Sequence, residues 1–521
     1  MSFARVYSAQ THLLRGAIVT VEVDITENTL HAFTLVGLPD KAVDESKDRM
    51  SSALKNSLFP SPKSQNQKIV ISLSPADIKK EGPYFDLAIA LAYLLSSKEI
   101  EFNPEGKIFL GELSLNGELR PIKGVLPLTQ EAKKRGFTEI FVPEANAKEA
   151  GLVEGITVYG ARTLREVTDH VRNVRINKKG EPTEEEPLRL TPQPHTEIET
   201  ENKTHHIDFS DIRGQEGAKR GLLIAACGGH NIALSGPPGT GKTMLARVFS
   251  HILPPLSHDE ILEVTGIHSI VGILEDTLVT EPPFRAPHHT ASYVSLIGGG
   301  ATIKPGEVTL AHKGVLFLDE FPEFEKRVLE SLRQPLEDNV VSISRAKGSA
   351  LFPSNFILIA AMNPCPCGNK GSKTKECICK PLDIDRYVRK LSGPIMDRID
   401  MWVTVGNVDY EALSTDKKEG EETSSLKEKV HRVRDIQKRR FSTATRILHT
   451  NSEMNAKELH HFAPLTPEVK QLLNQSAERL QLSARAYHRI IKLARTIADL
   501  DGHETIHESH ILEALQYRPK I

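Results

Sequence analysis

The spacing of apolar residues predicts three structural regions along the chain. In residues 17–25 every second position is apolar, and this alternation predicts a half-buried β-strand. Residues 69–73 predict a second strand, residues 87–95 predict a helix, and glycines and prolines punctuate the sequence that follows. We therefore expect residues 1–172 to form an α+β domain.

The central region alternates short apolar runs with helical patterns, an order that is typical of a doubly wound parallel α/β sheet. Three apolar runs predict its strands, namely residues 232–235, 315–318 and 356–361. We expect this α/β domain to cover residues 206–410. Polar stretches on both sides, residues 173–205 and 411–424, predict solvated linkers.

The C-terminal region, residues 425–521, is predicted to be entirely helical. Its first segment places Leu426, Val430, Val433 and Ile436 on one face of a helix. The chain is therefore expected to end in an all-α domain.

Composition and charge limit the classes of protein to which the chain can belong. Its 521 residues are too many for a single core, and its 66 basic and 68 acidic residues give no overall positive field. A nucleic-acid site would therefore be a local cluster of cations, such as the lining of a ring pore. The sequence shows neither a basic-then-apolar leader nor an apolar run of about 20 residues. We expect a cytoplasmic protein with no membrane partner.

A phosphate-binding loop follows the first predicted strand of the central domain. The pattern G-x-x-x-x-G-K-T is formed by Gly236, Pro237, Pro238, Gly239, Thr240, Gly241, Lys242 and Thr243. Its glycines let backbone N–H groups surround phosphate oxygens, and its lysine reaches the β- and γ-phosphates. The hydroxyl of Thr243 helps to hold Mg²⁺. The motif, followed by a predicted helix at residues 242–252, indicates that the chain binds ATP and Mg²⁺.

Two carboxylates and an asparagine follow the other two predicted strands. Asp319 and Glu320 resemble a Walker B motif, in which the first acid orders Mg²⁺ and the second polarises the attacking water. Alone, such a pair can simply mark a strand that meets solvent. Asn363 resembles the sensor-1 asparagine of AAA+ ATPases, although an asparagine before a proline can also be a turn residue. Together with the phosphate-binding loop, these residues predict a site of ATP hydrolysis.

Two arginine positions resemble functional arginines of AAA+ ATPases, and the first suggests a site shared between subunits. Arg398 lies in a segment similar to the one that supplies the arginine finger in minichromosome-maintenance helicases and magnesium-chelatase ATPase subunits. Its guanidinium would act on the γ-phosphate of a neighbouring subunit, unless it pairs with Asp397 or Asp400 of its own subunit. Arg485 matches the sensor-2 arginine of an AAA+ lid, with Arg489 one turn later as the alternative. A finger of this kind implies a ring of subunits.

Four of the five cysteines gather in one loop, residues 365–379. They are Cys365, Cys367, Cys377 and Cys379. Four thiolates can close a tetrahedral zinc site, although the C-x-C spacing is tighter than the common C-x-x-C, and reduced thiols without a metal are the alternative. We expect one structural Zn²⁺ per chain.

Two other loops carry candidate DNA contacts. Residues 340–344 and 349–352 read as the strands of a hairpin with Arg345 and Lys347 at its tip, and such hairpins in related rings grip the phosphate backbone in the pore. An insertion before the Walker B strand adds Arg285, His288 and His289. Both groups can also be ordinary solvated or packed loop residues.

These motifs closely resemble the ComM/YifB family of magnesium-chelatase-subunit-I-like AAA+ proteins, and the resemblance covers nearly the whole chain. Further family-like stretches are residues 36–40, 213–216, 228–231, 285–289 and 494–500. The resemblance implies an α/β AAA+ core, a helical lid and an N-terminal Lon-protease-like domain of the S5 domain 2 type. It also implies a homohexameric helicase that drives branch migration in natural transformation, with single-stranded or branched DNA and recombination proteins as partners.

The N-terminal domain is expected to lack the protease activity of Lon. The positions that align with the Lon serine and its lysine partner hold Tyr84 and Leu126. A Ser–Lys pair needs its own hydroxyl nucleophile and lysine base, so we predict that the domain serves assembly or DNA handling.

The leading prediction is therefore a hexameric ATP-driven DNA motor with active sites between subunits. One subunit would supply Lys242, Thr243, Asp319, Glu320 and Asn363, and its neighbour would supply Arg398. The alternative is a chelatase-type ATPase that remodels a protein partner. An inactive scaffold is disfavoured because every residue needed for hydrolysis is present.

Overall fold

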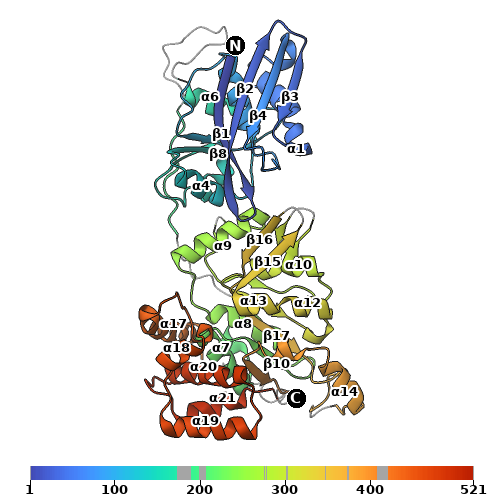
Figure 1. Ribbon diagram of the computed structural model, residues 1–521, viewed down its shortest axis with the longest axis vertical. Helices are drawn as coiled ribbons and strands as arrows, with labels where there is room; N and C mark the ends of the chain where they lie inside the picture. The colour runs from blue at the N-terminus through green and yellow to red at the C-terminus, as the bar shows by residue number, and fades with distance from the viewer. Residues whose placement is uncertain are drawn as a thin grey trace. The chain divides into compact units, whose positions relative to one another are not determined.

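The computed structural model describes residues 2–172, 189–198 and 207–519, apart from residues 275, 277, 301–302, 346–347, 372–374 and 408–420. The chain forms two compact units (Figure 1). The first contains Met1–Glu199 and His258–Val279, and the second contains Thr200–Ser257 and Thr280–Ile521.

A four-stranded sheet with the order β1-β2-β4-β3 forms the centre of the N-terminal unit. Its strands are β1 (Ser2–His12), β2 (Arg15–Glu27), β3 (Ala32–Val36) and β4 (Gln67–Ser74). β2 pairs antiparallel with β1 and β4, whereas β3 pairs parallel with β4. Val19, Val21 and Val23 are fully buried in β2, which confirms the strand predicted at residues 17–25. The other two predicted elements are β4 and α3 (Asp86–Ser96), and α3 packs on β1 and β2.

A parallel three-stranded sheet with the order β5-β8-β9 completes the N-terminal unit. Its strands are β5 (Lys107–Phe109), β8 (Glu139–Pro143) and β9 (Thr157–Ala161). The other elements are α1 (Lys41–Asp44), α2 (Ser46–Asn56), β6 (Glu112–Leu113), β7 (Leu119–Arg120), α4 (Val125–Lys134), α5 (Glu144–Ala150) and α6 (Leu164–Val171). The rings of Phe109 and Phe141 stack in the core with centroids 4.8 Å apart.

Tyr84 and Leu126, which the sequence aligned with the Lon serine and its lysine partner, are packed into this unit. The hydroxyl of Tyr84 lies 3.4 Å from the hydroxyl of Thr11, and burial raises the pKa of Tyr84. Leu126 is fully buried and clusters with Leu152 and Val153. Both side chains therefore contribute to the core.

Helix α9 (His258–Val271) lies within the N-terminal unit, although its sequence falls inside the predicted α/β domain. It packs on α4, where the hydroxyl of Ser269 accepts from the backbone N–H of Gly124 at 2.9 Å and donates to Glu149. Burial raises the pKa of that carboxyl. Leu262 and Leu278 cover the apolar cluster around Leu126, so this packing explains why the segment leaves the α/β domain.

Only part of the predicted linker at residues 173–205 lies among the described residues. Residues 189–198 run along the N-terminal unit, where Gln193 N–H donates to Val158 O at 2.8 Å and Thr196 N–H donates to Gly151 O at 3.0 Å. The rest of this predicted linker lies outside the described residues, namely 173–188 and 199–205. Most of the linker predicted at residues 411–424 also lies outside them.

The second unit is built on a parallel five-stranded sheet with the order β11-β14-β17-β10-β18. Its strands are β11 (Phe284–Arg285), β14 (Val315–Leu318), β17 (Ile357–Met362), β10 (Ile232–Ser235) and β18 (Met401–Thr404). The three apolar runs predicted as strands are β10, β14 and β17. Because parallel strands place their carboxyl ends at one edge of a sheet, the residues that follow these strands meet there.

Helices and short strand pairs surround this sheet. The helices are α7 (Glu216–Gly228), α8 (Lys242–Ile252), α10 (Tyr293–Ile297), α11 (Glu307–Leu310), α12 (Lys326–Ser331), α13 (Arg333–Asp338), α14 (Pro381–Val388) and α15 (Gly393–Met396). The strand pairs are β12 (Gly298–Gly299) with β13 (Lys304–Pro305), and β15 (Val340–Arg345) with β16 (Gly348–Pro353). β15 and β16 confirm the predicted hairpin.

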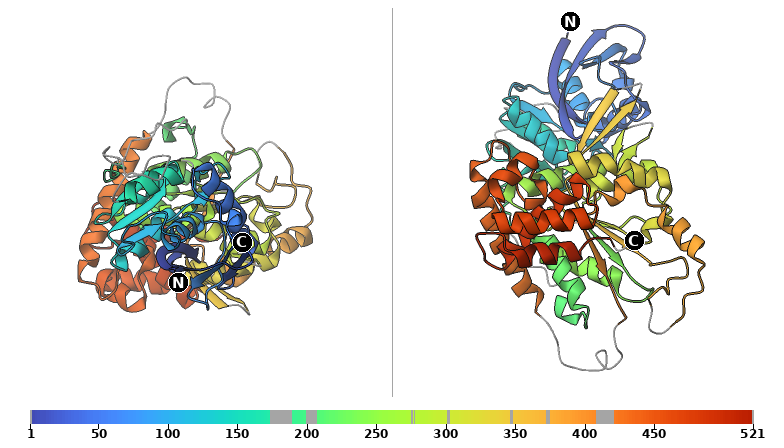
Figure 2. Two further views of the ribbon diagram at one scale, coloured as in Figure 1. Left: turned by 90° about the horizontal axis from the view of Figure 1, so that it is seen from above. Right: turned by 60° about the horizontal axis from the view of Figure 1, so that its bottom comes forward.

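The helical lid of the second unit is formed by α17 (Thr423–Arg440), α18 (Ala456–Phe462), α19 (Pro467–Arg479), α20 (Ala484–Leu500) and α21 (Glu508–Gln516). Figures 1 and 2 show α19, α20 and α21 side by side. α17 and α20 pack on α7, and one apolar core joins the lid to the sheet. No helix in the described part of the chain is long and apolar enough to span a membrane.

Candidate functional site

The phosphate-binding loop connects the central strand β10 to helix α8, as its sequence predicts. Gly239 and Gly241 have φ angles of +79° and +82°, a region that side chains with a Cβ rarely adopt. At Gly236 a Cβ would lie 2.1 Å from the carbonyl oxygen of Val405. These glycines let the loop turn tightly against β18 and present the N-terminus of α8 to phosphate.

Lys242 and Asn363 meet beside this loop. The ammonium group of Lys242 donates to Gly236 O at 2.7 Å, to Pro237 O at 2.8 Å and to Asn363 Oδ1 at 3.2 Å. Burial lowers the pKa of Lys242, while the charge of Asp319 opposes that shift. The lysine and the predicted sensor asparagine are therefore positioned to contact one phosphate group.

Thr243 and Asp319 supply a donor set that suits Mg²⁺. The hydroxyl of Thr243 donates to Asp319 Oδ2 at 2.9 Å. A hydroxyl and a carboxylate at the phosphate-binding loop are oxygen ligands of the kind that Mg²⁺ prefers, with phosphate oxygens and water completing its shell. These two residues would hold the ion, which neutralises negative charge on the phosphates.

Glu320 contacts His289, a residue that the sequence proposed only as a candidate DNA contact. Its carboxylate Oε2 lies 3.0 Å from His289 Nδ1, and its φ angle is +51°. Left-handed backbone at a residue other than glycine is often found at functional sites. His289 comes from the insertion after β11, so this loop reaches the predicted catalytic base.

The other two residues of this insertion have partners within it. Arg285 forms a two-point ion pair with Glu307, at 2.6 and 2.9 Å. The Nδ1 atom of His288 lies 2.9 Å from the hydroxyl of Thr290. The structure thus links His289 to the nucleotide site, whereas a DNA contact by Arg285 or His288 stays a prediction.

We expect His289→Ala to raise ATP turnover without DNA by roughly 5-fold, because a lost hydrogen bond of about 1 kcal/mol frees Glu320 to bind water. Steady-state phosphate release measures the effect. His288→Ala, which changes the adjacent imidazole, is the matched control and should leave basal turnover unchanged. Unchanged or lower turnover in His289→Ala would contradict a restraining role.

Arg398 is paired within its own subunit, but not with the neighbouring acids that its sequence suggested. Its Nη2 atom donates to Glu337, its Nε to Arg333 O at 3.1 Å and its Nη1 to Pro394 O at 2.7 Å. Its side chain is 14% exposed. The guanidinium therefore rests on helix α13.

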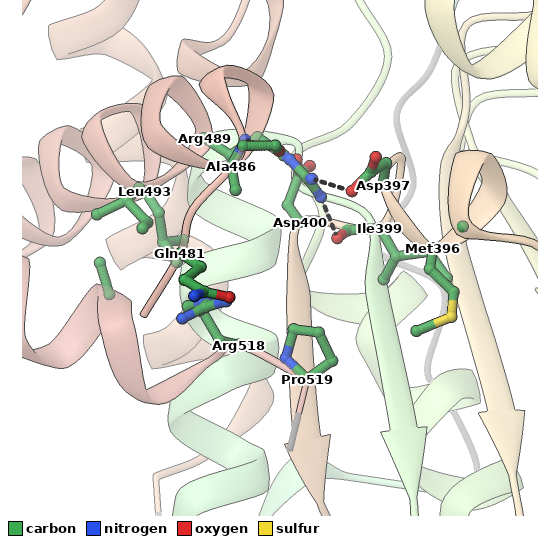
Figure 3. A pocket seen from close by; sticks show the side chains of 14 residues that line it. Met396, Asp397, Ile399, Asp400, Gln481, Ala486, Arg489, Leu493, Arg518 and Pro519 are labelled. Atoms are coloured by element: carbon green, nitrogen blue, oxygen red, sulfur yellow. Dashed lines mark hydrogen bonds and ion pairs between the residues drawn. The ribbon is translucent and has the colours of Figure 1, made fainter. Parts of the chain in front are cut away.

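The two arginines of the predicted sensor-2 helix have different partners. Arg485 Nη2 donates to Glu337 Oε1 at 3.2 Å, so it shares a carboxylate with Arg398. Arg489 donates to Ile399 O at 2.7 Å and to Asp397 Oδ1 at 3.3 Å (Figure 3). It borders a pocket of about 290 Å³ between α20, α21 and residues 393–400. Arg489 thus holds the segment around Arg398 through Ile399 and Asp397. The exposed Arg485 is joined to Arg398 through the carboxylate of Glu337.

Asn231 also holds this segment, from the side of the sheet. Its side chain donates to Arg398 O at 3.1 Å and accepts from Leu358 N–H at 2.8 Å, and its backbone exchanges hydrogen bonds with Asp400. One side chain thereby connects the strand of the phosphate-binding loop, the strand of Asn363 and the segment of Arg398. The family-like stretch at residues 228–231 was the only sequence signal for it.

The four clustered cysteines converge in the structure. The Sγ atoms of Cys365 and Cys367 are 3.4 Å apart, and Cys377 Sγ lies 3.7 Å from each. All four sulfurs lie within 4.8 Å of one another. A tetrahedral zinc ion with Zn–S bonds of ~2.3 Å would separate its ligands by ~3.8 Å. The donor set and its spacing therefore fit Zn²⁺.

The cysteine loop touches the phosphate-binding loop. At Gly368, φ is +79° and a Cβ would lie 2.7 Å from Pro238 Cδ. The two loops therefore pack against each other at Gly368 and Pro238.

Of the two cations predicted at the hairpin tip, the structure describes only the backbone of Arg345. Arg345 is the last residue of β15 and pairs with Gly348 of β16, whereas Lys347 lies outside the described residues. Their contact with DNA stays a prediction.

Comparisons with known proteins decide the family. Competence protein ComM of Haemophilus influenzae is 41% identical over 529 residues, which cover 100% of this chain and 98% of that protein. The chain belongs to the ComM/YifB family. YifB of Salmonella typhimurium is 39% identical over 523 residues, covering 99% of this chain and 97% of YifB.

Three family models of magnesium chelatase match this chain. They describe subunit ChlI over residues 208–413, subunit ChlI over residues 21–146, and the C-terminal part of subunit ChlI over residues 420–518. The magnesium-chelatase 67 kDa subunit of Heliobacterium mobile is 27% identical over 199 residues, 32% of this chain and 30% of that subunit. This ComM/YifB chain is therefore a magnesium-chelatase-like AAA+ protein, a class that implies ATP and Mg²⁺.

Proposed function

We propose that the chain is a hexameric ATP-driven DNA motor, a helicase that drives branch migration during homologous recombination and natural transformation. The observation that carries the proposal is the division of the hydrolysis residues into two groups. Lys242 contacts Asn363, and Thr243 contacts Asp319, whereas Arg398 and Arg485 both contact Glu337. Among the described residues, neither Arg398 nor Arg485 contacts Lys242, Thr243, Asp319 or Asn363, and this fits completion of the site by an arginine of a neighbouring subunit.

The DNA part of the proposal rests on the hairpin β15–β16 and on relatives. An antiparallel hairpin whose sequence has two cations between or at the ends of its strands suits sequence-independent contacts with phosphates. ComM of Haemophilus influenzae is named a competence protein. DNA repair protein RadA of Streptococcus pneumoniae is 37% identical over 107 residues, 20% of this chain and 25% of RadA. Single-stranded or branched DNA is therefore the proposed substrate, with recombination proteins as partners.

The N-terminal domain has a supporting role in this proposal. A Lon-protease-like fold with Tyr84 and Leu126 at the catalytic positions would be inert as a protease. It would serve assembly of the ring or handling of DNA.

The second candidate is a chelatase-type ATPase that remodels a protein partner. It is favoured by the family models, all of which describe subunit ChlI of magnesium chelatase. The two candidates share the ATPase site and differ in what the ring acts on.

ATP turnover with and without single-stranded and forked DNA separates the two candidates. The DNA motor should be stimulated by DNA and should displace strands or move a four-way junction. Absence of DNA binding at low salt, where phosphate contacts are strongest, would favour the remodelling ATPase.

We expect the double substitution Arg345→Ala, Lys347→Ala to lower DNA-stimulated turnover while basal turnover persists, because the hairpin lies outside the nucleotide-binding set. Removing two phosphate contacts should also weaken DNA binding about 10-fold or more at moderate salt, with a shallower salt dependence. Ser349→Ala on β16 keeps both cations and is the control. Unchanged stimulation in the double variant would contradict the assignment of the hairpin to DNA.

A further inference from the structure

Glu337 is hydrogen-bonded both to Arg398, which the proposed function assigns to a neighbouring nucleotide, and to Arg485 of the sensor-2-like helix. One carboxylate oxygen accepts from Arg398 Nη2, and the other accepts from Arg485 Nη2 at 3.2 Å. Two guanidinium groups repel one another, and a carboxylate between them offsets that repulsion. The two arginines therefore lie together around a single carboxylate.

Helix α13 connects this carboxylate to the hairpin. Glu337 is the fifth residue of α13, and Arg333 O, at the start of the same helix, accepts from Arg398 Nε at 3.1 Å. Only Asn339 separates α13 from β15. The side chain of Gln334 accepts from Ser342 N–H at 3.3 Å, and Asn339 O accepts from Ser354 N–H at 2.8 Å. These contacts connect the hairpin to the helix on which Arg398 rests.

We propose that Glu337 is a positioning residue that holds Arg398 and Arg485 as a pair and couples them, through α13, to DNA bound at the hairpin β15–β16. The inference rests on the proposed function, because it requires a composite nucleotide site and DNA at the hairpin. Glu337 itself touches no nucleotide in this scheme. It fixes the positions of the guanidinium groups of Arg398 and Arg485 when DNA is bound at the hairpin.

Glu337→Gln tests the coupling, since it keeps the size of the side chain and removes its charge. DNA stimulation of ATP turnover should fall by about 5-fold or more, the usual range of a coupling between two sites, while the Kd values for DNA and for ATP stay unchanged. Asp338→Asn removes the same charge from the next residue of α13, which makes no ion pair with Arg398 or Arg485 among the described contacts. This control should keep full stimulation.

Subunit mixing separates positioning of the arginines from a merely structural defect. Glu337→Gln subunits should gain DNA-stimulated turnover when mixed with Lys242→Ala subunits, which keep both arginines. They should gain none when mixed with Arg398→Ala subunits, because both variants damage the arginine-bearing side of the subunit and no interface then has intact arginines.

The outcomes distinguish this inference from the function on which it rests. If DNA does not stimulate the wild-type protein, the proposed function fails and the coupling fails with it. If DNA stimulates the wild type and Glu337→Gln keeps the same stimulation as Asp338→Asn, the coupling alone is overturned. Equal recovery of Glu337→Gln with both partner variants would also overturn it.

Discussion

Subunits with Lys242→Ala and subunits with Arg398→Ala should each lose about 100-fold or more of their ATP turnover, and mixing them should restore part of it. Lys242 lies at the phosphate-binding loop with Asn363, whereas Arg398 rests on α13 with Glu337. An arginine that acts in a neighbouring site is worth at least about 10³ in turnover. In a mixed ring, an intact loop can face an intact arginine, so turnover at those interfaces should return.

A second mixture controls for recovery that does not depend on a shared site. Glu320→Gln and Lys242→Ala both damage the nucleotide-binding side of a subunit, so their mixture should stay inactive. The measurement is steady-state ATP turnover across mixing ratios, with ring assembly checked by analytical ultracentrifugation. If the Lys242→Ala and Arg398→Ala mixture is no more active than its parents, Arg398 does not act between subunits.

The double substitution Cys377→Ser, Cys379→Ser should remove one zinc ion per chain and weaken ATP binding. Structural zinc sites contribute on the order of 10 kcal/mol to local folding, and the four sulfurs here converge within 4.8 Å. Because Gly368 of this loop packs on Pro238 of the phosphate-binding loop, loss of the metal should disturb the nucleotide site. Elemental analysis and nucleotide binding by calorimetry measure the two effects.

The fifth cysteine supplies the control for this prediction. Cys227 is buried in α7, where burial raises its pKa to about 12, and it is not part of the cluster. Cys227→Ala should keep the zinc ion and normal ATP affinity. A wild-type protein without zinc would refute the metal site and leave the cysteines as reduced thiols.

Local patterns in the sequence predicted β2 and β4 of the N-terminal sheet, β10, β14 and β17 of the five-stranded sheet, and the residues around the phosphate-binding loop. β2 follows from its alternation, and β10, β14 and β17 follow from continuous apolar runs, because each signal lies within a few neighbouring residues. The polar residues at the ends of these strands could be placed together since parallel strands end at one edge. Lys242, Asn363 and Asp319 are accordingly found where the sequence predicts them.

Contacts between residues far apart in the sequence could not be predicted in this way. For a pairing of Arg398 within its own subunit, the sequence suggested Asp397 or Asp400, yet its acid partner is Glu337, which lies 61 positions earlier. The link between His289 and Glu320 likewise depends on the path of an insertion loop. Such pairings are set by how whole elements pack, and no period or motif in the sequence encodes them.

The placement of α9 bears on how this protein can be shortened. The chain passes between the two units after Glu199, after Ser257 and after Val279, so no single cut separates them. A chain that begins at Thr200 would still carry α9 but would lose the residues that cover Leu262 and accept from Ser269. Its uncovered apolar surface would favour aggregation. An ATPase fragment for biochemistry should therefore replace residues 258–279 with a short polar connection.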